Sequence, residues 1–114
     1  EGPLDAISLQ RQGVNATCTM GCSVSRLQAE ILSLFEGKII LGYDNDEAGI
    51  RGVAKFETLR KEMIMPKISI CPLPKSYKDW NEAHIENFEL FDWIMRNTKL
   101  YNFEYKINNK IKLL

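Results

Sequence analysis

Cysteine and histidine are scarce in this chain of 114 residues, which holds three cysteines and one histidine. Cys18, Cys22 and Cys71 are an odd number without secretory context, which favours reduced thiols in the cytosol over a disulfide framework. Cys18 and Cys22 have no further cysteine or histidine in range to complete a zinc site. We therefore interpret them as small buried hydrophobic residues.

Long apolar runs and an excess of either charge are also missing. No stretch reaches the ~20 apolar residues that a membrane span needs. Fifteen basic residues balance fifteen acidic ones, so no overall electrostatic footprint for nucleic acid exists. The length and the composition, 45% hydrophobic and 26% charged, are typical of one soluble globular domain with a single core.

The charges are unevenly distributed between the two parts of the chain. Residues 1–50 hold three basic residues against seven acidic ones, whereas residues 51–114 hold twelve against eight. This distribution is either an acidic pole for a metal beside a more basic flank for phosphates, or chance scatter over a solvated surface. The sequence leaves both interpretations open.

Strand-like and helical patterns alternate along the chain, which predicts an α/β fold built from βαβ units. A capping box at Ser25 and Gln28 predicts one helix start, and Pro3 suits the first position of another. The expected strands are residues 15–19, 38–43 and 67–71, and the expected helices are residues 3–13, 25 onward, 47–63 and 88–97.

Apolar residues recur at helical spacing in three of these helices, and those of the last helix are expected to face in. Beyond the last helix, residues 101–107 alternate between apolar and polar, and Asn108-Asn109 are expected to form a two-residue hairpin turn into Ile111 and Leu113. The apolar faces are Leu27, Ile31 and Leu34 in the second helix, Ile50, Val53, Ala54 and Leu59 in the third, and Phe91, Ile94 and Met95 in the last.

The most hydrophobic predicted strand, residues 38–43, ends in two aspartates, and a glycine-containing helix start follows at once. Ligands bind at the carboxyl ends of parallel strands. Because Asp44 and Asp46 are two positions apart, both carboxylates project to the same side of an extended chain, and two hard oxygen ligands suit Mg²⁺. The competing interpretation is that Asp44, Asn45 and Asp46 only cap the following helix.

Three short motifs, each at a predicted strand end, resemble those of the Toprim family. In order they resemble its E-G-x-x-D opening, its D-x-D-x-A-G motif and the K-D-x-N-E segment of phage primase-helicases. Among Toprim proteins, the forms of the second and third motifs resemble those of primases of bacterial, phage or mobile-element origin. The resemblance covers residues 1 to about 85 and implies a Rossmann-like, mostly parallel four-stranded sheet flanked by helices. The motifs are Glu1-Gly2-Pro3-Leu4-Asp5, Asp44-Asn45-Asp46-Glu47-Ala48-Gly49 and Lys78-Asp79-Trp80-Asn81-Glu82.

This resemblance implies metal-dependent phosphoryl transfer, in which a DNA primase joins ribonucleoside triphosphates on a single-stranded DNA template. Asp44 and Asp46 would hold Mg²⁺ or Mn²⁺, with Asp79 as a third carboxylate. Glu1 would be either a metal ligand through water or the proton acceptor for the attacking 3′-hydroxyl. A replicative helicase, in the same chain or separate, would be a further partner. The expected phosphate contacts are Gly49, Arg51 and Lys78.

Two other functions are compatible with the same residues. A Toprim nuclease or a topoisomerase-like enzyme would use these carboxylates for hydrolysis or strand transfer, and a non-catalytic Toprim domain would serve as an interaction module. The family glutamate ends a first strand, which is expected to be missing here because Glu1 is the first residue. We expect residues 1–86 to form the catalytic domain and residues 87–114 a helix with a hairpin or the start of another segment. We also expect the chain to bind metal weakly and to make no primers unaided.

Two residues in and after the third motif have less specific interpretations. Trp80 either stacks on a base or, as is more common, packs beneath its own loop. His84 has no visible partner in the sequence and is expected on a helix surface. Neither residue is expected to be catalytic.

Overall fold

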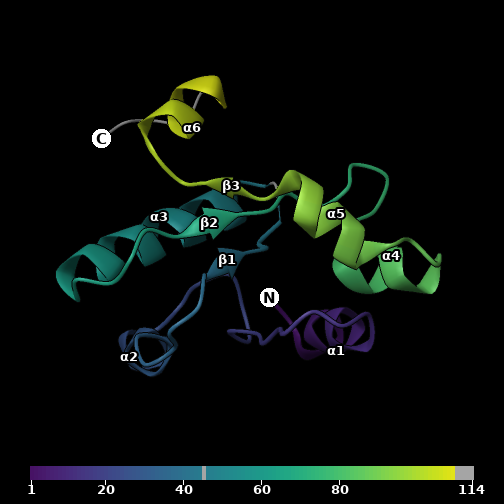
Figure 1. Ribbon diagram of the computed structural model, residues 1–114, viewed down its shortest axis with the longest axis horizontal. Coiled ribbons are helices and arrows are strands. Elements are labelled where there is room, and N and C mark those ends of the chain that lie inside the picture. Colours follow the sequence, from purple (N-terminus) through teal and green to yellow (C-terminus); the bar gives the residue numbers. More distant parts are fainter. Residues whose placement is uncertain (45, 110–114) are drawn as a thin grey trace.

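The computed structural model of the protein describes residues 1–44 and 46–109, which form six helices and three strands (Figure 1). None of the helices in these two ranges has the length and the apolar character needed to cross a membrane. The helices are α1 (Pro3–Arg11), α2 (Arg26–Leu32), α3 (Glu47–Glu62), α4 (Trp80–Ile85), α5 (Leu90–Asn97) and α6 (Phe103–Asn108), and the strands are β1 (Ile40–Leu41), β2 (Ser69–Ile70) and β3 (Lys99–Leu100).

The strands form one small mixed sheet in the order β1-β2-β3. β1 runs parallel to β2, with Ile40 opposite Ser69, and α3 makes the crossover between them. β3 runs antiparallel to β2, with Leu100 opposite Ser69. The fold is therefore α/β, but the described residues hold three strands, one of them antiparallel, where four mostly parallel strands were predicted.

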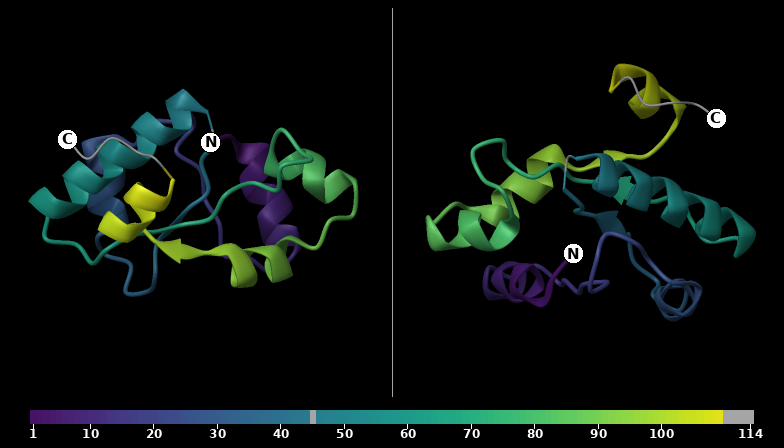
Figure 2. Two further views of the ribbon diagram at one scale, coloured as in Figure 1. Left: turned by 90° about the horizontal axis from the view of Figure 1, so that it is seen from above. Right: turned by 180° about the vertical axis from the view of Figure 1, so that it is seen from behind.

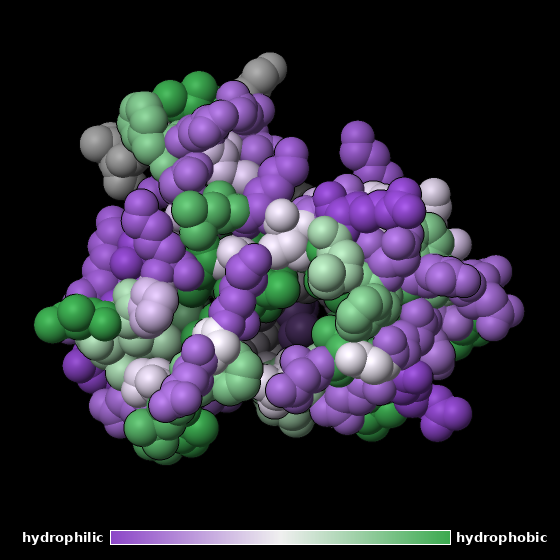
Figure 3. Space-filling model, in the orientation of Figure 1, coloured by the Kyte–Doolittle hydropathy of each residue, from purple (hydrophilic) through white to green (hydrophobic). Residues whose placement is uncertain are grey.

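The strand predicted at residues 15–19 does not form. Gln10 Nε2 donates a hydrogen bond to the carbonyl of Ala16 at 2.6 Å. A cavity of about 430 Å³ lies between this segment and β1, and both line it. Paired strands lie only about 5 Å apart, so two segments with this cavity between them are too far apart to form a ladder. Figure 3 shows the hollow on this face of the molecule.

The helices α1 to α5 form two groups on opposite sides of the sheet, and α6 lies apart from both (Figures 1 and 2). On one side α2 contacts α3, and on the other α4 contacts both α1 and α5. Each group surrounds its own hydrophobic cluster, and β2 with the residues that flank it supplies Ile68 to one and Cys71 to the other. The first core is Val24, Ala29, Leu41, Tyr43, Val53, Phe56, Met65, Ile68 and Tyr101, and the second core is Cys71, Leu73, Trp80, Ala83 and Leu90.

The cysteines are only partly placed as expected. Burial in the second core raises the pKa of the Cys71 thiol to about 11, which makes it an inert packing residue. Cys18 and Cys22 are half-buried, so their interpretation as core residues is wrong. All three thiols are free.

Helix starts follow the local sequence signals. Gly2 is the N-cap residue of α1 and Pro3 its first helical residue, as predicted. The capping box of α2 is also confirmed: Gln28 N donates to Ser25 Oγ at 3.1 Å, and Ser25 N donates to Gln28 Oε1 at 2.9 Å. These signals work because cap and helix lie within one turn of each other.

The buried faces of the helices only partly coincide with the apolar residues at helical spacing. α3 buries Val53 together with Gly49, Gly52 and Phe56. The two glycines are buried because neighbouring backbone approaches them closely. α2 buries only Ala29, and α5 buries Leu90 with Ile94 partly covered. The prediction that Phe91 and Met95 face in is wrong, because both are exposed. The other apolar residues at helical spacing that are exposed are Leu27, Ile31, Leu34, Ile50 and Ala54.

The C-terminal region forms β3 and α6 instead of the predicted strand and hairpin. Asn102 is the N-cap residue of α6, and its Oδ1 accepts a hydrogen bond from Tyr105 N at 2.9 Å. This cap overrides the alternating pattern, because it favours helical backbone directly after it. Asn109 ends α6 where the turn was expected, and Ile111 and Leu113 lie outside the described residues.

Candidate metal centre

The second motif lies between the end of β1 and the start of α3. Asp46 is the N-cap residue of α3, and its Oδ1 accepts a hydrogen bond from Gly49 N at 2.7 Å. The capping interpretation is thus correct for Asp46. It accounts for one of the two carboxylate oxygens, so capping and cation binding are compatible at this residue.

The third motif builds the start of α4 in the same way. Asp79 is the N-cap residue, and its Oδ1 accepts a hydrogen bond from Glu82 N at 2.7 Å. The side chain of Glu82 accepts a hydrogen bond from Lys78 N at 2.8 Å, which closes the turn. Asp79, like Asp46, keeps a second oxygen outside its cap.

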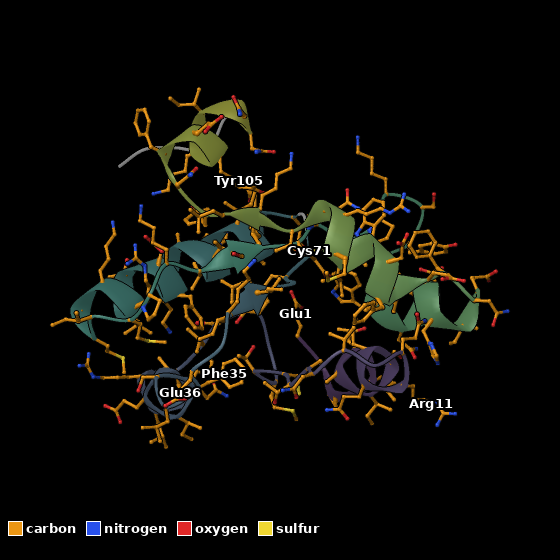
Figure 4. All side chains as sticks on the ribbon, viewed as in Figure 1. Glu1, Arg11, Phe35, Glu36, Cys71 and Tyr105 are labelled. Carbon is orange, nitrogen blue, oxygen red and sulfur yellow. The ribbon has the colours of Figure 1, made fainter. Side chains whose placement is uncertain are left out.

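Glu1 lies between β1 and α1, in the region where the surface is hollowed (Figures 3 and 4). Burial raises the pKa of its side chain, and the negative charges of Asp44, Asp46 and Asp5 raise it further, against the opposing effect of the N-terminal ammonium. These effects mean that Glu1 lies close enough to all three aspartates to interact with their charges.

Burial and neighbouring carboxylates act on Asp44 as they do on Glu1. Burial raises the pKa of Asp44 most, followed by the negative charges of Asp46, Asp5 and Asp79. Carboxylates from all three motifs therefore act on Glu1 or Asp44, although their segments lie far apart in the sequence, and we call Glu1, Asp5, Asp44, Asp46 and Asp79 the acidic cluster.

The chemistry of this acidic cluster suits a hard divalent cation. All its donors are carboxylates, and their mutual repulsion is what a cation would relieve. Within residues 1–44 and 46–109, however, no three histidine, cysteine, aspartate or glutamate side chains converge closely enough to hold a metal ion directly. Mg²⁺ usually takes one or two carboxylates and keeps several waters, which an open cluster of this kind can supply.

The three expected phosphate contacts have local roles in the fold. A Cβ at position 49 would lie 1.8 Å from the carbonyl oxygen of Asp44, so the missing side chain of Gly49 makes room for this backbone. Arg51 Nη1 lies 3.7 Å from Glu47 Oε2 on the exposed surface of α3. Lys78 is exposed next to the cap of α4. Their role as phosphate contacts stays a prediction.

Sequence reasoning missed two residues in or beside this cluster. Asp5 adds to the negative charge around Glu1 and Asp44, and its only sequence signal is its place in the first motif. Tyr43 lines the cavity, and its hydroxyl lies 3.1 Å from Thr19 Oγ1. Burial raises the pKa of Tyr43, so the phenol stays protonated at neutral pH.

The structure confirms the packing interpretation of Trp80 and corrects the interpretation of His84. Trp80 is buried against the end of β1, where its Nε1 donates a hydrogen bond to the carbonyl of Gly42 at 2.8 Å, so it is not available to stack on a base. His84 does have a partner, because its Nδ1 lies 2.9 Å from Gln12 Nε2. Both contacts join segments far apart in the sequence.

Asp44→Asn should make the metal-free domain more stable at neutral pH. Because the folded-state pKa of Asp44 lies above its ordinary value of 3.8, protonation favours the folded state, and this stabilisation is lost as the pH rises through the raised pKa. We expect the variant to gain less than about 1 kcal/mol at pH 7, since Asp44 is only half-buried, and to gain nothing at pH 3. Urea unfolding at both pH values measures this.

Asp92→Asn is the control for that experiment, because Asp92 is exposed and pairs with Arg96 on α5, away from the cluster. It should give no stabilisation at pH 7. A larger gain for Asp44→Asn at pH 3 than at pH 7 would contradict the proposed repulsion.

Comparison with known proteins identifies the family. The chain matches the Toprim-like family over residues 1–84, which include all three motifs. The protein therefore belongs to the Toprim-like family. No solved structure matches the chain.

The relatives with curated descriptions are DNA primases. The DNA primase of Listeria innocua serovar 6a is 28% identical over 109 residues, which are 95% of this chain and 17% of that primase. The DNA primase of Thermotoga maritima is 32% identical over 107 residues, 92% of this chain and 18% of that primase. That of Listeria monocytogenes serovar 1/2a is 35% identical over 75 residues, 65% of this chain and 12% of that primase. The protein is thus a Toprim domain of the primase type, and it spans less than a fifth of these relatives.

Proposed function

We propose that this domain is the nucleotidyl-transfer centre of a DNA primase, which makes RNA primers on single-stranded DNA from ribonucleoside triphosphates. One observation carries the proposal. Asp5, Asp46 and Asp79, although far apart in sequence, act through their charges on Glu1 or Asp44. A cluster of this kind favours a divalent cation and, through it, the phosphates of a nucleotide.

In this proposal Asp44, Asp46 and Asp79 hold Mg²⁺ or Mn²⁺. When bound, the cation screens the charge of the triphosphate and stabilises the leaving pyrophosphate. Asp46 and Asp79 keep their capping bonds through one oxygen and present the other, so their positions are fixed by α3 and α4.

Glu1 has the second role in the proposed site. The pKa of Glu1 is raised toward neutral pH, which suits a group that accepts the proton of a 3′-hydroxyl. The alternative role is to hold a water that coordinates the cation. Arg51, Lys78 and the backbone at Gly49 are the proposed contacts for the phosphates.

Mn²⁺ titration of the 114-residue chain, followed by electron paramagnetic resonance, tests the cation site. Asn caps a helix as well as Asp does, so Asp46→Asn and Asp79→Asn should keep both caps while removing one charge each. We expect each of these variants, and Asp44→Asn, to bind Mn²⁺ at least about 10-fold more weakly than the wild type. Asp92→Asn should bind as the wild type does. Equal affinities in all four variants would overturn the proposed ligands.

The reaction class needs a second measurement. With Mn²⁺ present, the chain should retain a ribonucleoside triphosphate in equilibrium dialysis, and Asp44→Asn should not. Nicking of supercoiled DNA that requires Asp44 would instead identify a Toprim nuclease or a topoisomerase-like enzyme. If the chain binds neither Mn²⁺ nor nucleotide, the remaining interpretation is a non-catalytic interaction module.

A further inference from the structure

We propose that Asp5 is a positioning residue, which fixes the start of α4, and with it Asp79, against α1, and that it does not contact the cation. This inference rests on the proposed function, because the site that Asp5 positions is the one proposed there. The hydrogen bonds between α1 and α4 carry the inference.

Asp5 is joined to the first turn of α4. Its Oδ1 accepts a hydrogen bond from the backbone N–H of Asn81 at 3.0 Å, across 76 positions in the sequence. The side chain of Asn81 is held as well, because its Oδ1 accepts a hydrogen bond from Ser8 Oγ at 2.9 Å. Ser8 is buried, so water does not compete effectively for this bond.

Gln12 repeats the pattern at the other end of α4. Its Nε2 donates a hydrogen bond to the carbonyl of Phe88 at 2.9 Å, and its Oε1 accepts one from Leu90 N at 2.8 Å. Residues 5, 8 and 12 are three and four positions apart, so they lie along one side of α1 and its C-terminal end. This polar side of α1 holds the segment from α4 to the start of α5.

The first turn of α4 is also tied to β1. Trp80 Nε1 donates a hydrogen bond to the carbonyl of Gly42, two residues before Asp44. Three consecutive residues thus have separate tasks: Asp79 caps the helix, Trp80 holds the end of β1, and Asn81 holds α1. Together these contacts set where Asp79 lies relative to Asp44 and Glu1.

The bond that Asp5 makes requires an acceptor oxygen but no negative charge, since its donor is a neutral backbone N–H. An asparagine at this position offers the same acceptor. A metal ligand behaves differently, because an amide oxygen is a much weaker ligand for a divalent cation than a carboxylate. Two substitutions therefore separate the roles: Asp5→Asn keeps the acceptor and removes the charge, whereas Asp5→Ala removes both.

Mn²⁺ titration of the 114-residue chain gives the first readout. We expect Asp5→Asn to change the affinity less than about threefold and Asp5→Ala to weaken it about 10-fold, the effect typical of residues that orient ligands. If Asp5→Asn weakens binding as much as Asp5→Ala does, the negative charge of Asp5 and not its hydrogen bond sets the affinity, and the inference is overturned.

Amide hydrogen exchange of Asn81 and Glu82 without metal gives the second readout. Both amides should exchange at the wild-type rate in Asp5→Asn and about tenfold faster in Asp5→Ala, because the turn opens more often. Wild-type exchange in Asp5→Ala would overturn the inference. If the wild type binds no Mn²⁺, the proposed function fails, but this exchange experiment still decides whether Asp5 holds α4.

Ser8→Ala keeps the inference testable if Asp5→Ala does not fold. It removes only the bond to the Asn81 side chain, so we expect faster exchange at Asn81 and Glu82 with a smaller change than in Asp5→Ala. Exchange as slow as in the wild type would show that these contacts do not hold the turn, which overturns the inference.

Discussion

Gly49→Ala is expected to destabilise the domain by more than about 2 kcal/mol and to weaken Mn²⁺ binding at the same time. The added Cβ would lie 1.8 Å from the carbonyl oxygen of Asp44 and 2.9 Å from its carbonyl carbon. Because the atoms it meets belong to the backbone, no side-chain rotation relieves the clash. Either α3 or Asp44 must move, and either movement shifts Asp44 relative to Asp46, the N-cap residue of α3.

Urea unfolding and Mn²⁺ titration measure the two effects of Gly49→Ala. Gly52→Ala is the matched control on the same helix, because its Cβ would lie 2.0 Å from the carbonyl oxygen of Cys22 and 3.3 Å from Cδ2 of Tyr43, and these nearest atoms belong to no acidic residue. It should destabilise the domain similarly without a specific loss of metal affinity in the molecules that remain folded. A Cβ at Gly2 meets nothing within 4 Å, so Gly2→Ala should be tolerated. Wild-type stability of Gly49→Ala would show that the close approach to Asp44 is wrong.

Trp80→Ala is expected to cost about 3–5 kcal/mol, the range for removing a large buried aromatic side chain. Trp80 is only 3% exposed, and its ring packs on Gly42 while Nε1 binds the carbonyl of that residue. Trp80→Phe keeps much of the apolar contact but leaves this carbonyl without its indole donor, which costs about 1–3 kcal/mol. Thermal and urea unfolding measure both variants.

Trp93→Phe provides a matched control for the indole bond. Trp93 Nε1 donates a hydrogen bond to the carbonyl of Pro72 at 2.8 Å and packs against the second core, but its contact is not with β1. Both Trp→Phe variants should lose stability, and only Trp80→Phe should also weaken Mn²⁺ binding, because it loosens the turn that carries Asp79. Equal metal affinities in the two variants would contradict that coupling.

The sequence predicts those parts of the fold that depend on neighbours within one turn. Pro3 and the Ser25–Gln28 capping box mark helix starts correctly, since the interacting groups are at most four residues apart. Pairing of strands depends on distant partners, and for this reason the segment at residues 15–19 was wrongly predicted as a strand. The Asn102 cap shows the reverse case, a local signal hidden by an alternating pattern.

The same distinction applies to the candidate site. The acidic motifs indicated the carboxylates from sequence, because their types and spacing are local features. The bonds from Asp5 to Asn81 and from Trp80 to Gly42 join positions 76 and 38 apart, so no local pattern predicts them. Where residues act through long-range contacts, only the three-dimensional arrangement shows the role.

The division of the apolar interior into two cores has a consequence for the energetics of the domain. Asp46 begins α3, which packs in the first core, whereas Asp79 begins α4, which packs in the second. A divalent ion shared by these carboxylates would link the part of the domain packed around the first core to the part packed around the second. By linkage, any hinge motion that spreads the two parts lowers the affinity for the ion, and the ion in turn resists that motion.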